Sequence, residues 1–140
     1  MPSINDFLVT FFTNSAPFFA NGGNPVPSST SFPLTGISNT PALLAAPVQV
    51  GAAGSRRLHA FNLHNPNAAV VFIQMFNSVA APVVGTDAPT RWIAIPAAGV
   101  IDGQREYSAP FNLGLWIAAT TTPNGAVAPA AGCPVSLGFI

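Results

Sequence analysis

From residue 48 onward, short apolar runs alternate with clusters of turn residues, and proline stands at the ends of the runs rather than inside them. This pattern is typical of an all-β sandwich or barrel, because proline cannot donate to a strand ladder. We therefore predict an antiparallel, jelly-roll-like β-sandwich over residues 48–140. The predicted strands are 48–50, 58–64, 70–76, 92–95, a weaker run at 106–111, then 113–121 and 135–140.

The run from residue 58 to 76 contains two of these strands, joined by Asn65-Pro66-Asn67. The turn residues predict a β-hairpin. Runs 70–76 and 113–119 are almost continuously apolar, which indicates strands covered on both faces. Either a neighbouring subunit or a larger core of the chain itself would provide the second cover, and both remain open. The candidates for the outer contact are Met75, Phe76, Trp92 and Trp116.

Residues 1–47 show neither helical nor strand periodicity, and are interrupted by Pro17, Pro25, Pro33 and the pair Gly22-Gly23. They predict an extended, irregular N-terminal arm. Its phenylalanines contribute about 1.5–3 kcal/mol each when buried, whereas ordering the backbone costs about 1–2 kcal/mol per residue. The arm is therefore expected to order against a partner, with packing on the chain's own core and simple disorder as alternatives. The partner-contact candidates are Phe7, Phe11, Phe12, Phe18, Phe19 and Phe32.

The 140-residue chain is 49% hydrophobic and only 6% charged, with four basic and four acidic residues. Such a surface favours self-association. The balanced charges cannot form the basic patch that phosphate neutralisation requires, so nucleic-acid binding is not expected. The longest apolar stretch, residues 7–20, is broken by polar residues and Pro17, so neither a membrane span nor a signal peptide is expected.

Few residues carry reactive chemistry. His59 and His64 lie at an odd spacing on one predicted strand, which sends their side chains to opposite faces and argues against a shared metal. Cys133 has no neighbouring base and is read as a small buried hydrophobe. Asp102 and Glu106 could form a carboxylate pair, but Asp102-Gly103 is more typical of a turn. We expect no enzyme, no cofactor and no metal.

Four motifs carry a family resemblance, in order along residues 58–140: the run from Phe61 to Phe76, the segment 84–89, the segment 92–97, and Gly114-Leu-Trp-Ile-Ala-Ala-Thr-Thr-Thr122. Together they resemble small virion proteins of tailed bacteriophages. The resemblance implies a β-sandwich virion component, such as a cement (decoration) protein on the head. Such proteins are often trimers seated over the contacts between capsid proteins, and they act without catalysis.

The expected function is therefore structural: a cement protein made in the host cytoplasm, located on the capsid surface and bound to the major capsid protein lattice, with a homotrimer favoured. A tail, baseplate or head-spike component is the alternative. A carbohydrate-binding sandwich would need Trp92, Trp116 and Tyr107 on one exposed platform, and a glycosidase would need the pair Asp102 and Glu106.

Overall fold

The computed structural model describes residues 36–140, together with the side chains of all these residues except 104–109. The described part contains β-strands joined by loops and no helix. The strands are β1 (Gly36–Leu43), β2 (Val48–Gln49), β3 (Arg56–His64), β4 (Val71–Asn77), β5 (Arg91–Ile95), β6 (Val100–Phe111), β7 (Leu115–Thr120) and β8 (Cys133–Phe139).

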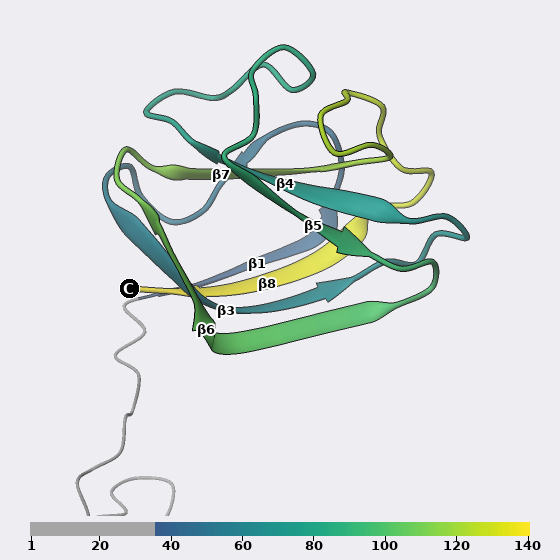
Figure 1. The fold of residues 1–140 in the computed structure, drawn as a ribbon, viewed down its shortest axis with the longest axis horizontal. Helices are drawn as coiled ribbons and strands as arrows, with labels where there is room; N and C mark the ends of the chain where they lie inside the picture. Colours follow the sequence, from purple (N-terminus) through teal and green to yellow (C-terminus); the bar gives the residue numbers. More distant parts are fainter. Residues whose placement is uncertain (1–35) are drawn as a thin grey trace, which may run out of the picture. The chain divides into compact units, whose positions relative to one another are not determined.

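The strands form two antiparallel sheets of four strands each (Figure 1). Sheet A has the order β1-β8-β3-β6, and sheet B has the order β2-β7-β4-β5. Consecutive strands lie in opposite sheets, except β4 and β5, which are neighbours in sheet B. This alternation between two four-stranded sheets is the jelly-roll arrangement. The predicted all-β, jelly-roll-like sandwich is therefore confirmed.

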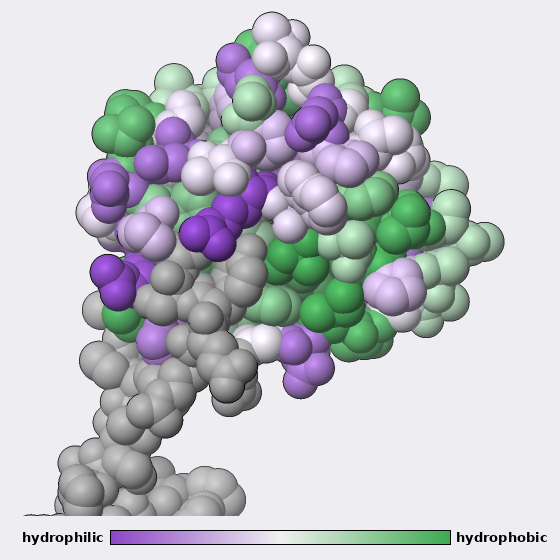
Figure 2. Space-filling model, in the orientation of Figure 1, coloured by the Kyte–Doolittle hydropathy of each residue, from purple (hydrophilic) through white to green (hydrophobic). Residues whose placement is uncertain are grey.

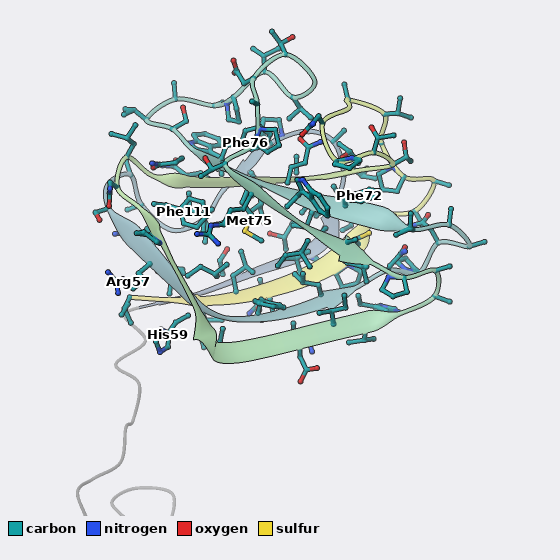
Figure 3. The ribbon with its side chains drawn as sticks, in the orientation of Figure 1. Arg57, His59, Phe72, Met75, Phe76 and Phe111 are labelled. Carbon is teal, nitrogen blue, oxygen red and sulfur yellow. The ribbon has the colours of Figure 1, made fainter. Side chains whose placement is uncertain are left out.

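The core lies between the sheets and follows the two-residue period of the strands. In β4, Val71, Ile73 and Met75 are buried in it, and β7 contributes Leu115, Ile117 and Ala119. Sheet A contributes the buried side chains Leu43, Leu58, Leu63, Phe111, Cys133, Val135, Leu137 and Phe139. Figure 3 shows Met75 and Phe111 reaching into the space between the sheets. No disulfide can stabilise the sandwich from within, because Cys133 is the single cysteine.

Strand β1 was not predicted, because it falls within residues 1–47 that the sequence assigned to the arm. It pairs with β8 over Gly36↔Phe139 to Thr40↔Val135, and its Leu43 is fully buried in the core. Its polar residues Ser38, Asn39 and Thr40, followed by Pro41, do not form the apolar run from which a strand is predicted. Proline is tolerated here because β1 is an edge strand and its register shifts between Thr40 and Leu43. The remainder of the predicted arm, residues 1–35, lies outside the described residues.

The predicted hairpin over residues 58–76 is wrong. Strand β3 pairs with β6 and β8 in sheet A, whereas β4 pairs with β5 and β7 in sheet B. The segment after β3 is therefore a corner that carries the chain from one sheet to the other. Both runs are apolar because they contact the same core from opposite sides, a pattern that a hairpin packed on a core also produces.

The turn expected at Asp102-Gly103 is also absent, since both residues lie inside β6. Phe61 pairs with Gly103, and a Cβ atom on Gly103 would clash with the Phe61 ring. Glycine therefore provides room for an aromatic side chain on the neighbouring strand, which is one of the functions of glycine within a sheet.

Two truncations test the place of β1. Residues 34–140 form one compact unit, so removing residues 1–33 should leave a cooperatively folded protein. Removing residues 1–45 deletes β1, uncovers the ladder of β8 and removes the buried Leu43. We expect this second variant to lose its cooperative thermal transition in circular dichroism. Equal melting of the two variants would show that β1 contributes nothing to the fold.

Candidate functional site

The contact residues predicted from the sequence fall into two groups. Phe7, Phe11, Phe12, Phe18, Phe19 and Phe32 lie outside the described residues. Of the others, Met75 is fully buried between the sheets and Phe76 is 2% exposed, so neither presents a surface to a partner. Trp92 is 47% exposed, and Trp116 is half-buried. Of the four predicted contact residues that the structure describes, Trp92 alone is exposed.

The outer face of sheet B is covered by two loops of the chain itself, residues 78–90 and 121–132, which Figure 1 shows on the side away from sheet A. Trp116 Nε1 donates to the carbonyl oxygen of Ser78, at 3.1 Å, which holds the first loop. The loops also meet, because a Cβ on Gly85 would lie 2.6 Å from Ala126 Cβ. The chain therefore supplies the second cover that β4 and β7 require.

The buried side chain of Gln74 holds the second loop, residues 121–132, against sheet B. Gln74 points outward from β4, between the half-buried Phe72 and the buried Phe76, and is itself fully buried. Its Nε2 donates to Thr120 Oγ1 at 2.8 Å and to the carbonyl oxygen of Gly125 at 3.0 Å. The local sequence does not predict that Gln74 holds this loop, because it shows only a single polar residue within an apolar run. The Nε2 group holds the loop through these bonds, whereas the buried Oε1 of the same amide accepts no hydrogen bond.

The corner after β3 is held by Asn65, whose side chain is fully buried. Its Nδ2 donates to the carbonyl oxygens of Ala69 (2.8 Å) and Pro96 (2.9 Å), and Ile95 O lies at 3.2 Å. Its Oδ1 accepts from the backbone N–H of Asn67 at 2.9 Å. The amide therefore fixes its own corner and joins it to the connection between β5 and β6.

Asn67 extends this network to a third connection. Its Nδ2 donates to the carbonyl oxygen of Ala131 at 2.9 Å, and its Oδ1 accepts from the N–H of Ala131 at 2.7 Å. Nδ2 also lies 3.9 Å from Cys133 Sγ. The turn signal of the sequence thus marks a place where three chain connections are tied together. The sequence pattern identified Asn65 and Asn67 as turn residues, but it did not indicate the distant residues to which they are hydrogen-bonded.

The candidate reactive residues of the described part lie on three strands of sheet A: His59 and His64 on β3, Asp102 on β6 and Cys133 on β8. Among the described residues, no three His, Cys, Asp or Glu side chains lie close enough to hold a metal ion. The register of β3 shifts between Leu58 and Ala60. This shift breaks the strict alternation that would place the His59 and His64 side chains on opposite faces. Asp102 is exposed on β6, and the Glu106 side chain is not described. Burial raises the pKa of the Cys133 thiol.

A strip of apolar side chains lies along the edge where β5 and β6 border the sandwich. Ile93 and Ile101 are partly buried against the core, and Val100 is 59% exposed. Figure 2 shows strongly hydrophobic residues gathered between these strands. Both are edge strands, each with one neighbour in its sheet. An exposed strand edge beside apolar side chains is a surface on which another chain can pair.

Comparisons with protein-family models, with curated proteins and with solved structures found no match. The residues that the structure describes include no helix with the length and hydrophobicity needed to cross a membrane.

Replacing Asn65 by alanine tests the corner. The substitution removes the donor of the part-buried carbonyl oxygens of Ala69 and Pro96 and of the buried carbonyl oxygen of Ile95, and an unsatisfied buried group costs about 1–3 kcal/mol. We expect Asn65→Ala to lower the free energy of unfolding by about 3 kcal/mol and Tm by roughly 10–20 °C. Calorimetry of the exposed control Asn112→Ala should show little change. Equal stability of the two variants would contradict the role of the amide.

The buried thiol predicts a dependence of stability on alkaline pH. The folded-state pKa of Cys133 is raised by burial, so the unfolded chain releases this proton at a lower pH than the folded chain. The contribution is complete below the unfolded-state pKa of about 8.5 and is lost as the pH rises from there through the folded-state pKa. Denaturant titrations should show a steeper alkaline loss of stability for the wild type than for Cys133→Ala. Parallel pH profiles would contradict this.

Proposed function

We propose that this chain is a structural protein of a tailed-bacteriophage virion: a cement protein that binds the assembled head lattice and stabilises it without catalysis. The proposal rests on the resemblance over residues 58–140 together with the surface of the sandwich. Jelly rolls are common in viral capsid proteins, but the same fold also serves lectins and enzymes. The fold agrees with the proposal and does not by itself select it.

The observation that carries the proposal is an exposed surface that is rich in apolar side chains and poor in charge. Among the described side chains, only Arg57, Arg91, Asp87 and Asp102 are both charged and exposed. The large apolar side chains that are exposed are Ile37, Leu44, Val70, Val79, Val83, Trp92, Val100, Leu113 and Val127. A surface of this kind suits a protein whose exterior is largely covered by neighbours.

Stabilisation would follow from mass action. A protein that binds the assembled lattice, but not its separated subunits, lowers the free energy of the assembled state by an amount set by its affinity and concentration. A stable contact buries about 1,200–2,000 Å² in total. The apolar β5–β6 edge is one surface available for such a contact, and the Phe-rich residues 1–35 would extend it on a neighbouring subunit.

The tail, baseplate or head-spike alternative shares these features and differs in location. The carbohydrate-binding alternative required a platform of Trp92, Trp116 and Tyr107. Trp92 pairs with Gln74 on one side of β4, and Trp116 pairs with Phe76 on the other, where its Nε1 is engaged by Ser78. With Trp116 half-buried and Phe76 covered by the loop of residues 78–90, these two tryptophans do not form one open platform.

Removal and re-addition test the proposal directly. Phage heads lacking this protein should release their DNA at a lower temperature than complete heads, and purified protein should restore the difference as a saturable function of its concentration. The variant without residues 1–33 should restore it only at higher concentration, because it lacks part of the contact. Heads of equal stability with and without the protein would contradict the cement function.

Immunogold labelling of intact particles separates the two locations. Label over the head supports the cement function. Label confined to the tail or baseplate would move the protein to the alternative class, while leaving a structural role in the virion intact.

A further inference from the structure

The outer face of sheet A carries a row of polar side chains that crosses all four strands. Asn39 on β1 pairs with Ser136 on β8, Ser136 pairs with Asn62 on β3, and Asn62 pairs with Asp102 on β6. Residues paired in this way place their side chains on the same face of a sheet. Asn39, Asn62 and Asp102 are exposed, and Ser136 is half-buried. The row is therefore open to a ligand that approaches the sheet from outside.

Two shallow hollows lie along this row and share Asn62 and Ser136. The first has a volume of about 190 Å³ and is bordered by Pro41 and Pro134. The second has a volume of about 240 Å³ and reaches to Ile37 and Asp102. The second hollow exists because Ala60 and Gly138, which line it, have little or no side chain. The hollows form one extended groove across the sheet, with Asn62 at its centre.

The polar side chains of the row suit a neutral ligand with many hydroxyl groups, and the exposed apolar side chains that border the hollows can contact the apolar faces of its rings. An asparagine amide offers both donors and an acceptor, a serine hydroxyl offers both, and a carboxylate accepts. The Ser136 hydroxyl donates to Asn39 Oδ1 at 2.6 Å, which orients this part of the row. The row contains no arginine or lysine, and Asp102 would repel an anion. Alternating donors and acceptors match the hydroxyls of a sugar chain, and waters can bridge the remaining gaps.

The same features disfavour a protein partner on this face. The row has no tryptophan, tyrosine or arginine, the residues that dominate protein interfaces. A flat protein surface would also desolvate the Asp102 carboxylate, for which the row offers no cation, and this desolvation is costly. A hydrated oligosaccharide leaves the carboxylate partly in water. Within the described row, the charge and polarity of the side chains therefore favour the sugar over a second copy of the chain.

We propose that the outer face of sheet A is a low-affinity binding site for neutral oligosaccharides, centred on Asn62 and formed with Asn39, Ser136 and Asp102. It is distinct from the Trp92 side of the molecule. The proposal does not depend on the virion function, because a glycan site would serve a protein exposed on any particle or cell surface.

The test is an NMR titration of the ¹⁵N-labelled full chain with three neutral probes: maltohexaose, cellohexaose and chitohexaose. At least one should shift the amide signals of Asn39, Asn62, Asp102 and Ser136, with a Kd of about 1 mM, as expected for a few solvent-exposed hydrogen bonds. Asn62→Ala should weaken this binding about tenfold. The matched control Asn112→Ala changes an exposed asparagine outside the groove and should leave the Kd unchanged. A hexamer of galacturonic acid should bind more weakly than the neutral probes.

Several results would overturn the proposal. One is the absence of localised shifts with all three neutral probes at about 10 mM. Another is a set of shifts centred on Trp92, which would place the site on sheet B. A lower oligomeric state of Asn62→Ala in sedimentation velocity would identify the face as an interface between copies. Failure of the head-stabilisation experiment would leave these readouts unaffected, so the two proposals can be judged separately.

Discussion

The buried amide of Asn65 is the interaction on which the arrangement of the strands depends. A jelly roll requires the chain to leave one sheet and enter the other, and each crossing leaves backbone groups that no strand ladder satisfies. Asn65 satisfies such groups in its own corner and at Pro96, and Asn67 reaches Ala131. Three connections are thereby fixed against one another. In a chain with one cysteine and few charges, the sandwich relies on its core and on such buried amides.

The closure of sheet B by loops of the same chain gives the two outer faces different characters. Gln74 and Trp116 hold loops over sheet B, so the apolar side chains of β4 and β7 are satisfied without a partner. The outer face of sheet A instead carries the polar row of Asn39, Ser136, Asn62 and Asp102. Ile93 and Ile101 lie at the β5–β6 edge, whereas Val100 shares the outer face of sheet A with Asp102, two residues along β6. The surface proposed for assembly and the surface proposed for sugar binding therefore adjoin at β6.

The strands from β2 onward could be predicted from the sequence, except for the first half of β6, where Asp102-Gly103 is typical of a turn; apolar runs bounded by turn residues are a local signal. The pairing of these strands could not be predicted. Strands β3 and β4 contact one core from opposite sheets, whereas the two strands of a hairpin lie in one sheet, and both arrangements produce the same local pattern of apolar residues. Strand β1 was not predicted because it contains Pro41. Proline is acceptable in an edge strand, but whether a strand lies at an edge depends on how the other strands are arranged. The partners of Gln74 and Asn65 lie about 30–50 residues away in sequence, beyond any local pattern.

A cryo-electron microscopy reconstruction of the complete phage particle is the decisive test of the proposed position on the head. We expect an eight-stranded jelly roll on the outside of the head, over the contacts between capsid proteins. The β5–β6 edge would lie against a neighbouring subunit, and the outer face of sheet A would be turned to solvent. Heads that carry no such density would contradict the assignment to the capsid surface. Density in which sheet A is buried against the lattice would contradict the division of surfaces.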